Sequence, residues 1–199
     1  FTFVHSNFRF MENFLKLHGV QKVDGILADF GISSHHIDAA ERGFAFRKEA
    51  ALDMRMNQSA KVTAASILNT YPPAELIRIF RQYGEITNAK PVVSKIVAFR
   101  ESTKMEQNTQ LLEAVKGLYP ARKENQFLAK LFQALRIEVN DELGALEDFL
   151  EQTPYILKPG GRLSLITYHS LEDRLVKSFI KNGSKHKENT EDIYGNRSV

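Results

Sequence analysis

The stretch that decides the fold is Val23-Asp24-Gly25-Ile26-Leu27-Ala28-Asp29-Phe30-Gly31-Ile32-Ser33-Ser34-His35-His36-Ile37-Asp38. The apolar run between Gly25 and Gly31 is typical of a central parallel strand, and it carries one carboxylate, Asp29, at its C-terminal end. Ligands of open α/β sheets bind beyond the carboxyl ends of such strands. Asp29 is therefore the first candidate for chemistry. The alternative is an ordinary surface Asp at the end of a strand.

A second strand is predicted over residues 163–168, after the Pro-Gly-Gly turn at 159–161 and before His169 and Ser170. More than a hundred residues separate the two strands, which far exceeds a normal crossover connection. Helical patterns separated by Pro, Gly, Asn and Ser fill part of that interval, at residues 63–69, 73–83, 91–101 and 109–118. The spacing predicts an α/β sheet with a small helical domain inserted between its strands.

The remaining elements follow from the same patterns. We expect a strand over residues 1–4, helices over 8–18 and 171–182, and one long helix over 125–153 that packs on the sheet. The predicted domains are a sheet domain of residues 1–38 and 126–182, an inserted loop and helical domain of 39–125, and a mobile polar tail of 183–199. The chain opens directly on a strand pattern with no Met, which is typical of the inside of a larger protein.

Composition narrows the class of protein. The 199 residues are 43% hydrophobic with 14 Phe, enough for a substantial core, and no run approaches the ~18 apolar residues of a membrane span. The absence of Cys excludes disulfides, thiolate metal sites and Cys nucleophiles and fits a reducing compartment, so we expect a cytoplasmic protein without membrane contact. A pI near 9.0 and local Lys/Arg clusters permit contact with a polyanion, although most such clusters are solvated faces.

Several short motifs have weak functional interpretations. Asp29-Phe30-Gly31 lacks the other protein-kinase motifs, and the adjacent His35 and His36 do not complete a metal site, so no metal is expected. Ser170 is expected to cap a helix beginning at residue 171, with Asp173 at its third position. His169 is open to two interpretations, a site residue or a buried ring hydrogen-bonded to the backbone.

Five segments in this order resemble the MraW or RsmH family of bacterial 16S rRNA cytosine-N4 methyltransferases: Asp29-Phe30-Gly31-Ile32-Ser33-Ser34, Glu41-Arg42-Gly43-Phe44-Ala45-Phe46, Leu52-Asp53-Met54-Arg55-Met56, Phe132-Gln133-Ala134-Leu135-Arg136-Ile137-Glu138-Val139-Asn140 and Tyr168-His169-Ser170-Leu171-Glu172-Asp173-Arg174. The resemblance implies a Rossmann-like class I methyltransferase sheet with an inserted all-helical domain. It also implies S-adenosylmethionine as the cofactor and a cytidine in the decoding region of 16S rRNA, in the small ribosomal subunit, as the substrate.

The resemblance assigns cofactor contacts to Phe8, Asp29 and His36, the last standing where the family usually has Gln. The family's Gly-Gly-His loop and the acidic residue after its second strand have no counterpart here, so the chain resembles a fragment lacking the N-terminal cofactor-binding segment. Two alternatives therefore stay open. One is another class I methyltransferase acting on RNA or protein, and the other is an inactive RNA-binding remnant. A homodimer is also possible.

The implied chemistry needs a group that accepts a hydrogen bond from the cytosine amine, whose lone pair is delocalised into the ring. Asp29 is expected to do this, with His169 as a second catalytic candidate. The target base must leave its stack, and aromatic or cationic side chains can hold it. The loop over residues 33–58 is rich in both and is typical of a binding loop. The predicted substrate-binding residues are Phe44, Phe46, Arg47, Arg55 and Tyr168.

Overall fold

The computed structural model describes residues 1–33 and 42–183, and the chain divides into two compact units. The first, called the sheet unit, comprises residues 1–31 and 143–199, and the second, called the helical unit, comprises residues 32–142. No helix in the described part of the chain is long and apolar enough to cross a membrane. The mixed α/β class expected from the sequence is confirmed.

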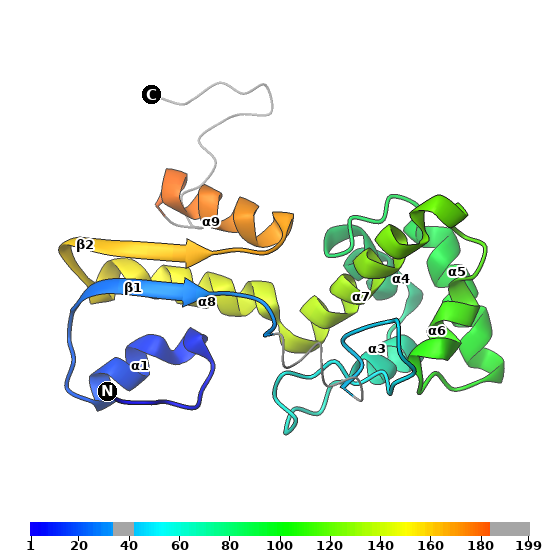
Figure 1. Cartoon of the computed structure of the whole chain (residues 1–199), viewed down its shortest axis with the longest axis horizontal. Helices are drawn as coiled ribbons and strands as arrows, with labels where there is room; N and C mark the ends of the chain where they lie inside the picture. The colour runs from blue at the N-terminus through cyan, green and yellow to red at the C-terminus, as the bar shows by residue number, and fades with distance from the viewer. Residues whose placement is uncertain (34–41, 184–199) are drawn as a thin grey trace. The chain divides into compact units, whose positions relative to one another are not determined.

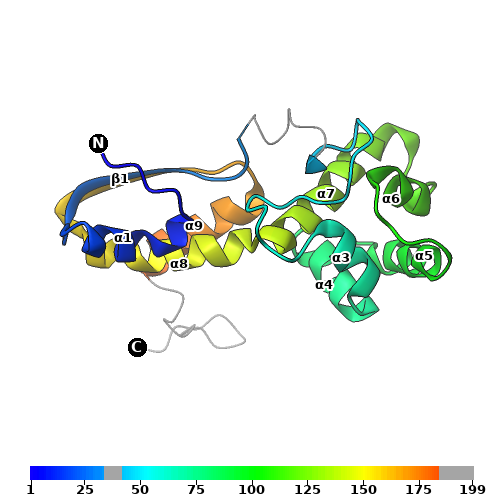
Figure 2. The same cartoon turned by 90° about the horizontal axis from the view of Figure 1, so that it is seen from below.

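The sheet unit contains two parallel strands, β1 (Val23–Asp29) and β2 (Leu157–Ile166), which end together because Asp29 pairs with Ile166. A 3-10 turn (Phe8–Phe10) leads into α1 (Met11–Leu17), and α8 (Glu142–Ile156) and α9 (Ser170–Asn182) follow later in the chain. In Figure 2 the helices α1, α8 and α9 lie on one face of the strands. The side chains of Ile26 and Ala28 pack toward this face, whereas Leu27 between them is 75% exposed.

Two predictions for the sheet unit need correction. Residues 1–4 form no strand, because a strand needs a ladder partner, and within the described ranges 1–33 and 42–183 the backbone of this segment makes only the turn bond from Ser6 N–H to the Val4 carbonyl. The second strand begins at Leu157 rather than after the Pro-Gly-Gly turn, and the pairing jumps from Val23↔Leu157 to Gly25↔Arg162. The Pro-Gly-Gly segment is therefore an irregularity within β2, with Gly160 at a φ of 79°.

The helical unit confirms the four helices predicted between the strands. They are α3 (Ala64–Thr70), α4 (Pro73–Gln82), α5 (Ala89–Ser102) and α6 (Asn108–Val115), followed by the 3-10 turn Ala121–Lys123 and α7 (Glu124–Asn140). Figure 1 shows α7 running alongside α4. Their apolar faces form one continuous buried core that includes Ile67, Phe80, Ile96 and Leu135.

The single long helix predicted over residues 125–153 is instead two helices. Asp141, in the left-handed region at φ 49° and ψ 45°, ends α7, and α8 begins at Glu142. The apolar stripe that looked continuous serves two separate cores: Leu135 of α7 belongs to the core of the helical unit, and Phe149 of α8 belongs to that of the sheet unit. Helix α7 thus lies in the helical unit, although the sequence analysis placed residues from 126 onward in the sheet domain.

Two asparagine side chains of the helical unit hold the irregular segment over residues 42–60. Asn108, fully buried, accepts from the Ala50 N–H at 3.1 Å and donates to the Lys48 carbonyl at 2.6 Å. Asn140 accepts from the Met56 N–H at 2.7 Å and donates to the Met54 carbonyl at 2.8 Å. Because side-chain amides satisfy its backbone, this segment is ordered without forming a helix or strand.

Candidate cofactor and active site

The carboxyl end of the sheet brings Asp29 and Tyr168 together. Asp29 is the last residue of β1, and Tyr168 follows the end of β2 by two residues. The Tyr168 hydroxyl donates a hydrogen bond to the Asp29 carboxylate, and this bond, together with the negative charge, raises the pKa of the Tyr168 phenol. Tyr168 remains 66% exposed, so its ring is still accessible to a ligand.

A glycine makes room for that tyrosine. Gly31 has a φ of 85°, and a Cβ added there would lie 3.3 Å from Cδ2 of the Tyr168 ring. A side chain at this position would both strain the backbone and press on the ring. The Asp-Phe-Gly triplet therefore has a local structural explanation. Asp29 supplies the carboxylate, and Gly31, which has no side chain, leaves space for the Tyr168 ring.

Three aromatic rings and Asp29 line the same part of the sheet unit. The Phe30 ring is buried and meets the rings of Phe8 and Phe149 edge-on, with centroid distances of 5.4 and 5.5 Å, and Phe8 and Phe149 are 5.6 Å apart. Of these three rings, the sequence resemblance indicated Phe8 but not Phe30 or Phe149. The signal for Phe149 was its place in an apolar helical stripe, which predicts burial but does not identify the neighbours of the buried ring.

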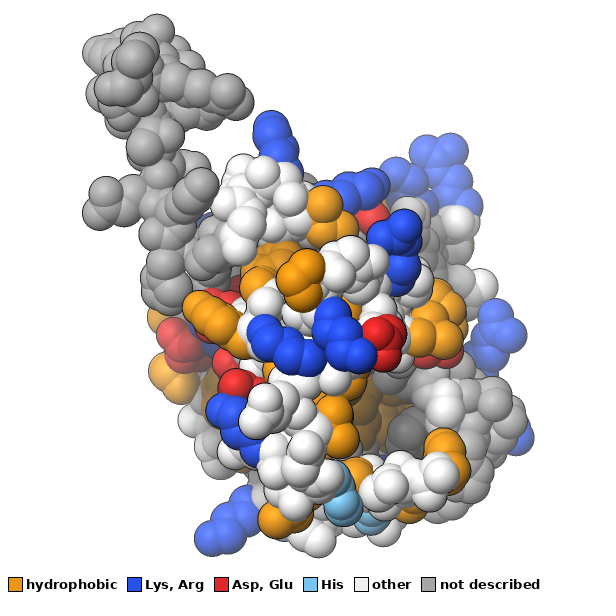
Figure 3. Space-filling model, turned by 90° about the vertical axis from the view of Figure 1, so that its left-hand side faces the viewer, with side chains coloured by type: hydrophobic (Ala, Val, Ile, Leu, Met, Phe, Trp, Pro, Cys, Tyr) orange, Lys and Arg blue, Asp and Glu red, His pale blue; other side chains and the backbone are white. Residues whose placement is uncertain are grey.

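A hollow of about 510 Å³ opens beside these rings, within the range of small-molecule sites. The hollow is lined by residues between positions 2 and 8, by helix α1 and by strand β1, and both Phe8 and Asp29 are among the lining residues. Figure 3 shows hydrophobic side chains gathered inside a hollow on the face that it displays. Apolar walls with an aromatic ring and one carboxylate fit a ligand that combines a flat heterocycle with positive charge.

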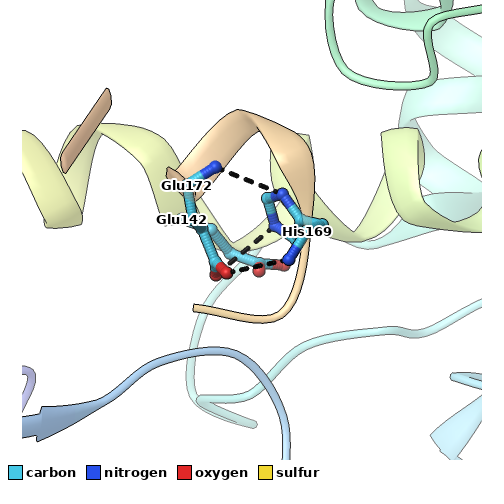
Figure 4. Close-up of side chains that lie close together, drawn as sticks. All are labelled: Glu142, His169 and Glu172. Atoms are coloured by element: carbon cyan, nitrogen blue, oxygen red, sulfur yellow. Dashed lines mark hydrogen bonds and ion pairs between the residues drawn. The ribbon is translucent and has the colours of Figure 1, made fainter. Parts of the chain in front are cut away.

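His169 holds the start of α9, as Figure 4 shows. Its Nδ1 accepts from the Glu172 N–H at 3.4 Å, and the Glu172 carboxylate accepts from the backbone N–H groups of Tyr168 at 2.8 Å and His169 at 3.4 Å. This reciprocal capping box corrects the expectation for Ser170, which is the first residue of the helix rather than its cap. A His-x-x-Glu box escaped the sequence analysis because Ser is much the commoner capping residue.

The other predicted substrate residues lie in the helical unit. The Phe46 ring packs on Phe132 at 5.6 Å, and Arg55 bonds the Asp53 carboxylate at 2.6 and 2.8 Å as well as two loop carbonyls. These side chains support the loop. Phe44 is half-buried with the Arg42 guanidinium 5.5 Å from its ring centroid, and Arg47 is exposed.

The structure therefore groups the predicted site residues into two sets. Phe8, Asp29, Tyr168 and His169 belong to the sheet unit, and Asp29 contacts Tyr168 directly. Phe44, Phe46, Arg47 and Arg55 belong to the helical unit. His36 lies outside the described residues.

Comparison with known proteins identifies close relatives. The model of the MraW methylase family matches residues 1–194. The chain is 52% identical over 196 residues to the ribosomal RNA small subunit methyltransferase H of Bacteroides fragilis and 52% identical to that of Amoebophilus asiaticus, in each case over 98% of its length. It is 49% identical over its whole length to the protein of the same name from Christiangramia forsetii. The chain spans 63% to 66% of these relatives.

Proposed function

The chain belongs to the MraW methylase family, and on this premise we propose that it is the cofactor- and base-positioning part of an S-adenosylmethionine-dependent methyltransferase. The proposed reaction is methylation of N4 of a cytidine in the decoding region of 16S rRNA, in the small ribosomal subunit and in the cytoplasm. The observation that carries this proposal is that Phe8 and Asp29 line one hollow at the carboxyl end of β1.

The lining residues would divide the binding of the cofactor between them. Phe8, 39% exposed, offers an aromatic face to the adenine ring, while its other contacts to Phe30 and Phe149 fix its orientation. Asp29 offers negative charge to the cationic part of the ligand. When bound, S-adenosylmethionine supplies an activated methyl group on a sulfonium leaving group. His36, at the place where the family usually has Gln, is proposed as a further contact.

Asp29 is also the proposed catalytic residue. Its carboxylate would accept an N–H bond from the cytosine amine, which draws the lone pair back onto N4. The same carboxylate would take that proton as the N–CH3 bond forms and the bond between the methyl group and sulfur breaks. A carboxylate has about four lone-pair sites, so accepting the Tyr168 hydroxyl leaves capacity for the base. Holding amine and methyl in line contributes up to about 7–11 kcal/mol in favourable reactions of this type.

Tyr168 and His169 then have different roles. The exposed Tyr168 ring is proposed to contact the flipped base, and its hydroxyl fixes the Asp29 carboxylate. The His169 ring already caps α9, which keeps the first residues after β2 in place. We therefore propose His169 as a positioning residue that acts through Tyr168. Of the loop residues, Arg47 and Phe44 are proposed to contact the RNA, whereas Phe46 and Arg55 would shape the loop.

The test uses the full-length protein with S-adenosylmethionine and small ribosomal subunits that lack the modification, with mass spectrometry of the nucleosides. N4-methylcytidine is the expected product. The Asp29→Ala variant should lose at least about a hundredfold in rate, since proton transfer from the reacting group to a positioned side chain contributes about 10²–10⁴-fold. Its circular dichroism should match that of the parent protein, because Asp29 is exposed.

Three outcomes would redirect the proposal. Label on another RNA or on a protein would favour a different methyl acceptor. RNA binding without calorimetric binding of S-adenosylmethionine would favour a non-catalytic RNA-binding role. Unchanged turnover in Asp29→Ala would remove Asp29 from the mechanism. A homodimer, the remaining expectation, would appear in sedimentation of the same preparation.

A further inference from the structure

The helical unit has a groove that the proposed site does not use. It has a volume of about 310 Å³ and lies between the start of α5 and the segment that leads from α6 into α7. Tyr119 and Phe127 form its aromatic part, and Lys123 and Lys130 line it as well. All of these residues belong to the helical unit, so the groove is complete within it.

The two aromatic rings are rigidly placed yet accessible. Their centroids are 4.8 Å apart with an interplanar angle of 32°, and both residues are half-buried. The Tyr119 hydroxyl donates to the Glu124 carboxylate at 3.1 Å, and partial burial together with this bond raises the pKa of Tyr119. The hydrogen bond holds the tyrosine in one orientation, which lowers the entropy cost of stacking a ligand on its ring.

The positive charges around the groove are not neutralised within the described part of the chain. Lys123 and Lys130 line the groove. Three further cations, Lys90, Lys116 and Arg122, are close in sequence to lining residues. None of the five forms an ion pair with another described residue. Two arginines of the same unit differ from these cations because each forms an ion pair: Arg78 pairs with Glu138 and Arg136 pairs with Glu142. One acid, Glu85, lines the groove, and the carboxylate of Glu124 accepts the hydrogen bond from Tyr119.

From these observations we propose that the groove binds an unpaired nucleotide of RNA, with the base on the Tyr119 and Phe127 rings and neighbouring phosphates on the lysines. Single-stranded RNA is recognised by stacking on aromatic side chains, and its backbone by Lys and Arg. An apolar peptide would not need the excess of cations. The inference rests on the proposed function, since it assigns part of the RNA substrate to a second surface apart from the methyl-transfer site.

The charge half of the proposal is tested with the full-length protein and a labelled single-stranded RNA of about 12 nucleotides, a length within the site sizes of such proteins. The Lys123→Gln/Lys130→Gln variant should reduce the slope of log affinity against log salt by about 1.4, that is about 0.7 for each lost phosphate contact. The matched control, Lys61→Gln/Lys95→Gln, removes the same charge from residues that do not line the groove and should keep the parental slope.

The stacking half is tested at Tyr119. Tyr119→Leu removes the ring and should weaken RNA binding by about 5- to 100-fold without changing the salt slope, whereas Tyr119→Phe keeps the ring and should bind almost normally. Thermal melting of both variants controls for a loss of fold.

The outcomes separate this inference from the proposed function. Parental binding and salt slope in both groove variants would overturn the inference even if the protein forms N4-methylcytidine. Weaker binding to assembled subunits with unchanged binding to protein-free rRNA would also overturn it, in favour of a ribosomal protein as the occupant. Failure of the parent protein to methylate any RNA would contradict the proposed function alone, because groove binding is measured without turnover.

Discussion

The two units of this protein differ in how completely they bury their apolar residues. The helical unit has a continuous core in which Phe80, Ile96 and Leu135 are wholly buried. The described part of the sheet unit has a core cluster of five buried residues, Phe30, Leu146, Phe149, Leu150 and Val176. Among the described residues, every exposed large hydrophobic side chain except Val62 lies in the sheet unit.

The more completely buried core and the proposed chemistry therefore lie in different units. The residues proposed for methyl transfer lie in the unit with two strands and the smaller core, and a sheet of two strands is marginal without further packing. The helical unit buries its core residues within itself, and asparagine side chains hydrogen-bond the backbone of its long loop. We expect the helical unit to be the more stable of the two and the sheet unit to gain stability from a bound ligand.

The largest expected effect comes from matched deletions of one buried ring in each unit. Phe80→Ala and Phe149→Ala should each cost about 3–5 kcal/mol in free energy of unfolding, because both rings are fully enclosed. Hydrogen exchange followed by mass spectrometry should locate the loss of protection in the mutated unit alone. Loss of protection across both units from either variant would show that the two cores unfold together.

A pair of glycines tests the difference in packing density. A Cβ at Gly84 would lie 2.8 Å from the Phe80 carbonyl oxygen and 2.9 Å from that of Lys130, so Gly84→Ala should destabilise the helical unit by about 1–3 kcal/mol. At Gly25 in β1 the nearest atom would be the Arg162 carbonyl oxygen at 3.5 Å. Gly25→Ala should therefore be neutral or stabilising by up to about 1 kcal/mol in urea unfolding. Equal costs at both positions would contradict this contrast.

The cap of α9 separates positioning from direct chemistry in the sheet unit. His169→Ala should cost about 1 kcal/mol of stability and lower the methylation rate, because the helix start beside Tyr168 loosens. His169→Asn restores a good capping side chain and should recover both stability and rate. If His169→Asn recovers stability but stays as slow as His169→Ala, the imidazole takes part in catalysis itself.

The smallest effect is a change in one titration. The Asp29 bond raises the pKa of Tyr168, so the bond is fully present below the phenol's ordinary pKa of about 10 and is lost as pH rises through the raised value. In Asp29→Asn the Tyr168 pKa should fall toward the ordinary value. NMR of ring-labelled tyrosine, with Tyr168→Phe to assign the signal, measures it. An unchanged Tyr168 pKa in Asp29→Asn would contradict the hydrogen bond.

The sequence predicted the elements whose patterns are local. Strand β1, the four helices between 64 and 115 and helix α9 appear close to their expected limits, because alternation and helical spacing reflect which face of an element is buried. The prediction was wrong for residues 1–4 and for the undivided helix over 125–153. Both errors have one cause, since neither a strand partner nor a change of core is visible within the segment itself.

The α/β class, the carboxylate at the end of β1 and the resemblance that the family match confirms were all evident from the amino-acid sequence. Only the tertiary structure decided that Phe30 and Phe149 support Phe8, that Tyr168 bonds Asp29, and that Arg55 serves its own loop. The physical reason is that residue type and spacing set local conformation and chemical capacity. A side chain's partners depend on distances between segments that are far apart in the chain.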